Sequence, residues 1–495
     1  MAKSSMATES WSEFNVIEKR SLSIAAGVRL REFCVVDLPN VFASVYGWIP
    51  AFVTEGGTVV MLLGKELVRI ECRREGKPVC SGRCKIESEK GWEGEVVVFD
   101  LPEDIVLNIL CRLPVKSLIR FTCFSKRWRS IIISDSQFAR TTFQLASQNR
   151  TLRQRLLLCT NPDHEDNGPP RFQCLGNLRV PRFGGNSMVQ SLSLTPEVET
   201  ARVMLASCNG LVVLGQRLRS FFTNLSLWNP STGFHRKIPS PVFSMKEGTN
   251  SSSVAYGFGH VMATDEYKLV FFELLDLAVH IFSTRDMSWK VIRAPHSSFP
   301  GYGMSIFTPR SSFPEYNGVP LLVSNGACHW VRNWVPEPAI YAFDLAEEEF
   351  SKLSLPLALM PELPNGLYAR QIYTQVLREG CLCVWTWNCY GYAEFWEMKE
   401  YGVPESWVKL FHFSVRDLPD IFVSTIGWTP VLVTEGGTVV FDLYDKKFYG
   451  DRELVRVKCH REDKPVCSGR CKIEGAIEGL AEYAVMVYDE TLLSV

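Results

Sequence analysis

The 495-residue chain lacks a charge excess of either sign. It holds 53 Lys plus Arg against 54 Asp plus Glu, a net charge of −1. A balanced chain has no overall attraction to nucleic acid or to an anionic membrane surface. The short basic run of Lys126, Arg127 and Arg129 carries only three charges, and a solvated face or an acidic partner explains it better than a nucleic acid does. We expect neither nucleic acid nor membrane as a partner.

Long apolar runs are also missing. No stretch approaches the ~20 apolar residues that a membrane-spanning helix needs. The polar N-terminus, residues 1–15, does not resemble a signal peptide, and the weakly apolar stretch at 21–28 is interrupted by Arg29 and Arg31. The expected location is therefore the cytoplasm, the nucleus or both.

Motifs for catalysis or cofactor binding are scarce. The eight histidines are dispersed, and none forms a His-Glu-x-x-His pair. The segment that ends in Gly64-Lys65 has the wrong spacing for a phosphate-binding loop and is followed by Glu66 instead of Ser or Thr. Gly257-Phe-Gly259 lacks the third glycine of a dinucleotide-binding loop. We expect no catalytic residue and no cofactor.

Cysteine is plentiful, with 16 residues, but a chain of this length can rely on its apolar core rather than on disulfides. One trio of cysteines is spaced closely enough to suggest zinc, yet it has no evident fourth ligand. We interpret these residues as buried or loop thiols and expect no metal site. The trio occurs twice, as Cys72, Cys80 and Cys84 and as Cys459, Cys467 and Cys471.

The chain repeats part of itself. Residues 33–60 reappear at 413–440 with 18 of 28 positions identical, and residues 66–87 reappear at 453–474 with 18 of 22 identical. Such close agreement over two blocks in the same order indicates a duplicated structural unit.

We therefore interpret residues 1–95 as a partial duplicate of the C-terminal β region, in which 33–87 copies 413–474. Between the two blocks, 441–452 is shortened to the five residues 61–65. A tail fragment of a sister protein fused in front of a complete one would explain the pattern, and so would a merged gene model. We expect the copy to hold only the hairpins that close the β domain, and two or three isolated strands are marginally stable in water.

The pattern of the rest of the chain predicts a succession of β-hairpins. Each candidate has apolar or aromatic residues on both sides of a short polar or Gly/Pro turn. The spacing of about 45–60 residues suits one propeller blade per unit, although an irregular β-sandwich is an alternative. The candidates are 227–238, 281–292, 342–353, 394–410 and 440–457, with second hairpins marked by Asn-Gly at 208–214 and 324–331.

Residues 100–143 break this pattern. Pro102 suits the first turn of a helix, Pro114 ends that helix and starts another, and Ser125 can cap a third. Three short helices cannot bury all their apolar side chains among themselves, so a partner is expected. Packing against the β domain is the alternative.

This helical segment resembles an F-box of the type common in plants. The resemblance rests on LPEDIVLNILCRLPVKSLIRF, CFSKRWRSII and SDSQFAR, which contain two Leu-Pro pairs and a Ser-Lys-x-Trp-Arg-Ser helix. A second set, SCNGLVVL, LWNPSTGFHRKIP, YGFGHVMATDEYKLV and IYAFDLAEEEF, looks like the kelch-like F-box-associated domain of the same proteins. We place the F-box at 96–145 and the F-box-associated β domain at 155–480. The expected fold is mainly β: a kelch-like β-propeller-type domain, a three-helix F-box and the N-terminal duplicate.

The resemblance implies the substrate-recognition subunit of an SCF-type ubiquitin ligase. The F-box would dock on a Skp-family adaptor, which connects to a cullin and a RING subunit, and the β domain would bind a protein target whose identity the sequence does not reveal. The receptor itself would be non-catalytic. By position, the adaptor contacts would be Leu101, Pro102, Ile105, Leu110, Leu113, Pro114, Leu118, Phe121 and Trp128.

Two other functions compete with this one. A propeller could recognise a glycan or small molecule outside any ligase, or it could be an enzyme. Neither explains the Leu-Pro-rich helical segment, and the dispersed histidines argue against the enzyme.

Overall fold

In the computed structural model the described residues alternate with undescribed connections. The chain divides into two compact units, 1–108 with 120–129, and 109–119 with 130–495, which we describe separately. The described residues are 48–53, 58–63, 66–71, 79–85, 107–108, 110–122, 126–160, 171–175, 189–192, 203–218, 221–243, 254–273, 276–293, 319–332, 338–359, 370–378, 380–388, 391–418, 422, 427–433, 437–444, 452–459, 464–472 and 483–495.

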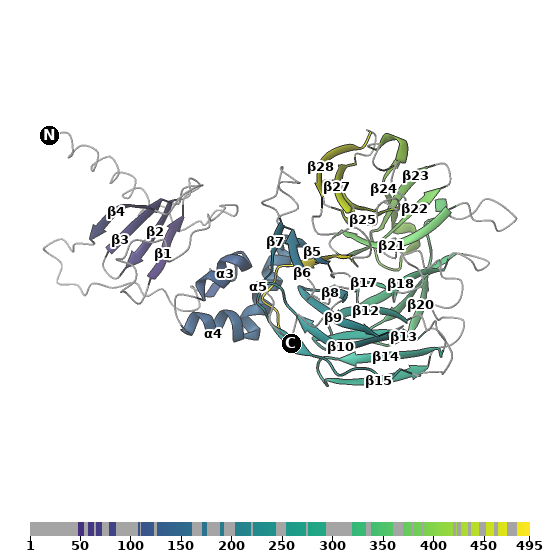
Figure 1. The fold of residues 1–495 in the computed structure, drawn as a ribbon, viewed down its shortest axis with the longest axis horizontal. Helices are drawn as coiled ribbons and strands as arrows, with labels where there is room; N and C mark the ends of the chain where they lie inside the picture. The colour runs from purple at the N-terminus through teal and green to yellow at the C-terminus, as the bar shows by residue number, and fades with distance from the viewer. Residues whose placement is uncertain are drawn as a thin grey trace, which may run out of the picture. The chain divides into compact units, whose positions relative to one another are not determined.

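The C-terminal unit is a six-bladed β-propeller (Figure 1). Each blade is an antiparallel sheet, and the innermost strands of neighbouring blades lie side by side in a closed ring: β8, β12, β17, β21, β25 and β29. The expected mainly β, propeller-type fold is therefore confirmed, and the sandwich alternative was wrong.

The first three blades follow each other along the chain. Blade 1 contains β8 (Val203–Cys208), β9 (Leu211–Leu218), β10 (Phe221–Trp228) and β11 (His235–Lys237). Blade 2 contains β12 (Val254–Val261), β13 (Glu266–Glu273), β14 (Ala278–Ser283) and β15 (Ser288–Arg293), with β16 (Val319–Pro320) parallel to β12. Blade 3 contains β17 (Leu322–Ser324), β18 (Ala327–Arg332), β19 (Ala339–Asp344) and β20 (Phe350–Leu353).

The remaining blades include the two ends of the domain. Blade 4 contains β21 (Arg370–Arg378), β22 (Cys381–Asn388), β23 (Tyr392–Met398) and β24 (Trp407–Ser414). Blade 5 contains β25 (Gly427–Val433), β26 (Thr438–Tyr444), β27 (Arg452–Lys458) and β28 (Val466–Lys472). Blade 6 combines β29 (Tyr483–Asp489) with β5 (Gln154–Thr160), β6 (Arg171–Leu175) and β7 (Val189–Ser191). Single turns of 3₁₀ helix lie at Leu357–Leu359, Pro404–Ser406 and Val415–Asp417.

The tight turns follow from Asn-Gly pairs. Asn209 and Gly210 connect β8 to β9 with φ of 51° and 86°, and Asn325 and Gly326 connect β17 to β18 with φ of 49° and 73°. Two successive positive φ values are required by the hairpin turn that matches strand twist, and Asn-Gly adopts them at low cost. Both second hairpins predicted from these pairs are confirmed.

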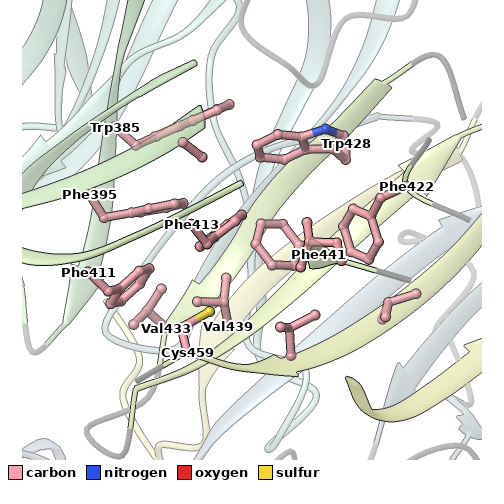
Figure 2. Packing of buried hydrophobic residues seen from close by; sticks show 14 of the residues in the cluster. Trp385, Phe395, Phe411, Phe413, Phe422, Trp428, Val433, Val439, Phe441 and Cys459 are labelled. Atoms are coloured by element: carbon pink, nitrogen blue, oxygen red, sulfur yellow. The ribbon is translucent and has the colours of Figure 1, made fainter. Parts of the chain in front are cut away.

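Apolar clusters between blades form the core. Blades 4 and 5 bury Trp385, Phe395 and Phe413 against Trp428 and Phe441 (Figure 2). Trp428 and Phe441 meet edge to face with ring centroids 5.4 Å apart, a favoured arrangement for aromatic pairs. Because each blade is covered on both sides, a strand such as β13 is buried along its whole length.

The ring is closed by pairing between the two ends of the domain. β29 pairs antiparallel with β5, from Tyr483 opposite Thr160 to Asp489 opposite Gln154. The propeller therefore extends beyond residue 480, where the sequence suggested that the domain ends. The repeated segment 413–474 covers the end of blade 4 and all of blade 5, so the expectation that it closes the domain was wrong.

The N-terminal unit contains a four-stranded antiparallel sheet of β1 (Trp48–Val53), β2 (Thr58–Leu63), β3 (Glu66–Glu71) and β4 (Val79–Lys85). Its strand order matches that of β25–β28. The duplicate is therefore a complete blade in its strand content, and more than the isolated hairpins that the sequence suggested.

Two glycines on the inner strand of blade 2 permit the close approach of blade 3. A Cβ atom on Gly257 would lie 2.5 Å from Cys328 Sγ, and one on Gly259 would lie 2.5 Å from Leu345 Cδ1 and 2.6 Å from Val323 Cγ1. The Gly-Phe-Gly motif thus serves blade packing.

We expect Gly259→Val to lower the free energy of unfolding by about 1–3 kcal/mol, because the added side chain overpacks the contact between blades 2 and 3. Urea unfolding followed by tryptophan fluorescence measures the change. Ser351→Val, at an exposed position on β20, is the matched control and should change stability by less than about 0.5 kcal/mol. Equal midpoints for both variants would refute the packing role of Gly259.

Candidate functional site

Three helices occupy the predicted helical segment: α3 (Val115–Phe121), α4 (Lys126–Ser134) and α5 (Ser136–Gln148). The carbonyl of Pro114 accepts hydrogen bonds from the Ser117 and Leu118 amides and so begins α3. Most of the first predicted helix, and Ser125, lie outside the described residues.

The structure separates the predicted adaptor contacts by exposure. Leu118 is fully buried and Leu110 is 5% exposed, so a charge at either position would be buried in the chain itself and would destabilise the fold. Leu113, Pro114, Phe121 and Trp128 are half-buried and offer apolar surface. Leu101, Pro102 and Ile105 lie outside the described residues. Adaptor binding by these side chains stays a prediction.

Sequence reasoning missed α5. Asp135 caps this helix, because its carboxylate accepts hydrogen bonds from the Gln137 and Phe138 amides at 2.8 and 3.1 Å. Phe138 and Thr142 are buried on one side of the helix, and Thr142 hydrogen-bonds Cys111 from the preceding helical region. The signal was present as an Asp-Ser cap followed by buried positions four residues apart.

α5 also joins the helical segment to the propeller. The Thr151 and Leu152 amides donate to the Ala146 carbonyl, and β5 begins only a few residues later. Arg140 of α5 forms an ion pair with Asp265 in the β12–β13 turn at 2.8 Å, and Asp265 also contacts His260 Nε2 at 3.0 Å. Arg140 and Asp265 are both about half exposed, so the pair orients the junction while contributing little stability.

The two faces of the propeller differ in their connections. The face that we call the turn face carries the short connections 209–210, 262–265 and 325–326. In an antiparallel blade the connections between the second and third strands, and those to the next blade, lie on the other face. This loop face receives long connections such as 238–253 and 294–318.

α5 leads into the propeller on the turn face, because β5 is the second strand of blade 6 and begins there, next to the Asp489 end of β29. In proteins generally, binding residues concentrate on loops held by a rigid scaffold. The loop-face connections lie mostly outside the described residues.

Two buried histidines have structural partners. His280 contacts Glu273 at 3.1 Å inside blade 2, and His329 contacts the Tyr401 hydroxyl at 2.8 Å between blades 3 and 4. Within the described part of the chain, no group of three His, Cys, Asp or Glu is placed to hold a metal ion. Nor is any helix there long and apolar enough to cross a membrane.

The cysteine trio of blade 5 does not converge. Cys459 lies in the cluster between blades 4 and 5, and Cys467 packs against the same cluster. Cys471 lies in the cluster between blades 5 and 6. Because the thiols are divided between opposite sides of one sheet, they cannot share a tetrahedral ion. The corresponding thiols of the N-terminal copy lie outside the described side chains.

His329 predicts a pH effect. It is fully buried, and burial lowers its pKa to about 4. An unfolded histidine has a pKa of about 6.5. Between pH 4 and 6.5 the unfolded chain therefore binds a proton at His329 that the folded chain does not bind. The free energy of unfolding should therefore fall as the pH falls from about 6.5 to 4, by up to about 3 kcal/mol.

The measurement is urea unfolding across this pH range for the native chain and for His329→Gln. All other titratable groups are the same in the two chains, so the difference between their free energies of unfolding isolates His329. In His329→Gln the free energy of unfolding should depend less on pH between 4 and 6.5. His412→Gln, exposed on β24, is the control and should keep the pH dependence of the native chain. An unchanged slope in His329→Gln would show that His329 titrates normally.

Comparisons with known proteins agree with the motifs. The F-box domain family model matches residues 98–139. An F-box protein of Arabidopsis thaliana is 28% identical over 343 residues, covering 62% of this chain and 71% of the relative. An F-box/kelch-repeat protein of the same plant is 26% identical over 366 residues, covering 69% and 85%. Among solved structures, TolB from Acinetobacter baumannii aligns with a TM-score of 0.33 at 10% identity, covering 72% of each chain.

Proposed function

We propose that this chain, which carries an F-box domain at residues 98–139 and is similar to plant F-box proteins, is the substrate-recognition subunit of an SCF-type ubiquitin ligase in the cytoplasm or nucleus. The observation that carries the proposal is the F-box helical segment joined directly to a six-bladed propeller. Its F-box binds a Skp-family adaptor, and through that adaptor a cullin and a RING subunit. Its propeller binds the protein to be ubiquitinated.

The receptor performs no bond chemistry in this role. It raises the effective concentration of the target near the ubiquitin-conjugating enzyme, and this proximity supplies the specificity. A rigid receptor serves the role better than a flexible one, because a target held in many orientations spends less time near the enzyme. Within the propeller unit, α5 is joined to β5 by a short connection, and Arg140 of α5 pairs with Asp265.

The adaptor surface is built from apolar side chains that α3 and α4 leave partly exposed. Phe121 and Trp128 are the large aromatic members of this set, and both are half-buried. Aromatic residues of this kind supply most of the binding energy at protein interfaces, because they displace much water and lose little conformational freedom. Leu113 and Pro114 are apolar and half-buried as well.

We expect Phe121→Ala combined with Trp128→Ala to weaken adaptor binding at least tenfold, which corresponds to about 1.4 kcal/mol or more. Isothermal titration calorimetry with a purified Skp-family adaptor measures the affinity, and circular dichroism verifies the fold. Val291→Ala, an exposed apolar position on β15, is the matched control and should bind as the native chain does.

Affinity purification provides the cellular test. The native chain should recover an adaptor and a cullin, and the Phe121→Ala, Trp128→Ala chain should lose both. Failure of the folded native chain to bind any Skp-family adaptor in either experiment would refute the proposed function.

A further inference from the structure

Blade 5 has a second version in the same chain, and the two versions agree in their strand pairing. The β1–β2 pairing is irregular between Pro50 and Phe52, and β25–β26 is irregular between the equivalent Pro430 and Leu432. The β3–β4 pairing shifts between Arg69 and Ile70, and β27–β28 shifts between the equivalent Arg456 and Val457. Bulges re-aim all side chains beyond them, so equal bulges give equivalent positions on the two sheets.

Blade 5 is held in the ring by its two apolar faces. Toward blade 4 it presents Trp428, Val439 and Phe441 (Figure 2). Toward blade 6 it presents Val440 and Leu454. The space between blades 4 and 6, which we call the blade-5 slot, is thus lined on both sides by apolar surface that a sheet of matching shape can cover.

The N-terminal sheet has apolar residues at the register positions that fill this slot. The positions equivalent to the blade-4 face are Leu38, Phe42, Trp48, Val53, Val59, Met61, Leu63, Val68, Ile70 and Cys72. The positions equivalent to the blade-6 face are Ala51, Phe52, Val60, Leu67 and Cys84. No charged residue occupies any of these positions, so the copy preserves both packing surfaces in sequence.

The substitutions at other slot positions are of a kind that burial tolerates. Thr429 and Asp442 are buried cross-strand neighbours in blade 5, and the Thr429 hydroxyl has no hydrogen-bond partner among the described residues. Ile49 and Leu62 replace them in the copy. Exchanging a buried polar pair for apolar residues is often neutral or stabilising.

A strained turn is preserved as well. Gly437 has φ of 70°, and a Cβ there would lie 2.5 Å from the Cys459 carbonyl oxygen. The copy has Gly57 and Cys72 at these positions. The bidentate ion pair between Glu453 and Arg470, at 2.6 and 2.7 Å, has its equivalents in Glu66 and Arg83.

We propose that the blade-5 slot is a binding site for the chain's own N-terminal sheet, β1–β4, so that two sheets compete for one place in the propeller. The occupant is this segment because its register, its bulges and the apolar positions of its two faces match those of β25–β28. Because this sheet and the slot belong to one chain, its binding is intramolecular and does not depend on protein concentration.

The exchange alters the loop face. The connection from β26 to β27 spans 445–451, whereas β2 and β3 are connected by Gly64 and Lys65 alone. By topology this connection lies on the loop face. If that face binds the target, as the proposed function holds, one chain presents two alternative recognition surfaces that differ by this loop.

The test uses single substitutions in the full-length chain. Trp428→Asp prevents β25–β28 from filling the slot, and Trp48→Asp does the same for β1–β4, since a buried unpaired charge is strongly unfavourable. Each single variant should keep the cooperative melting transition of the propeller, with a melting temperature lowered by at most about 4 °C. The double variant should lose the transition.

Phe395→Asp is the matched control. Phe395 is fully buried in the same cluster, but it belongs to blade 4 and has no second copy, so this variant should lose the transition by itself. A Trp428→Asp chain that melts as poorly as the double variant would overturn the proposal. Light scattering should show the folded Trp428→Asp chain as a monomer, and folding only as a dimer would overturn the assignment to the chain's own slot. Neither readout involves the adaptor, so failure here leaves the proposed ligase function standing.

Discussion

Pairing between β29 and β5 is the contact on which the architecture depends. It joins residues more than 300 positions apart, from Tyr483 opposite Thr160 to Asp489 opposite Gln154. Beside it, Arg155 and Glu490 form an ion pair at 2.6 Å with both side chains largely buried. Because such a contact closes a very long loop, its entropic cost is met only when the blades between the two ends already pack. Ring closure is therefore the step that makes six separate sheets one domain.

Closure also determines where the helical segment attaches. β5 is the second strand of blade 6 and follows α5 directly, so the pairing that closes the ring also anchors α5. The C-terminal segment adds to this anchor, because Asn229 of blade 1 donates to the Thr491 and Leu493 carbonyls at 3.1 and 2.9 Å. Gly210 leaves room for it, since a Cβ there would lie 2.2 Å from Thr491 Oγ1. The two ends of the propeller and the connection from α5 thus meet on the turn face.

Most of the hairpins could be predicted from local sequence. The pairing of strands far apart in the chain could not. Asn209-Gly210 and Asn325-Gly326 identify their turns because few other dipeptides adopt two positive φ values. The pairing of β29 with β5 has no comparable local signal, so the domain was expected to end at residue 480, before its last strand. Because the pairing of β29 with β5 was not foreseen, the repeated segment 413–474 was expected to close the domain. In the helical segment, the resemblance to an F-box selected both Leu118, which is fully buried, and Trp128, which is half-buried. A match by position does not show which apolar residues the protein itself covers.

In a propeller, each blade packs mainly on its two neighbours. Replacing one blade therefore disturbs fewer contacts than replacing a central element of a fold with a single core. Blade 5 meets blade 4 through one cluster and blade 6 through another, so a substitute needs to match two surfaces. It must also have the correct bulges, because a shift of one residue would turn its apolar side chains to the wrong face. The N-terminal sheet meets the register requirement through its pairing and the surface requirement through its sequence. The two copies differ most in length at the connection between the second and third strands. Packing constrains the strands of both copies, whereas this connection is free to vary and so to change what the loop face presents.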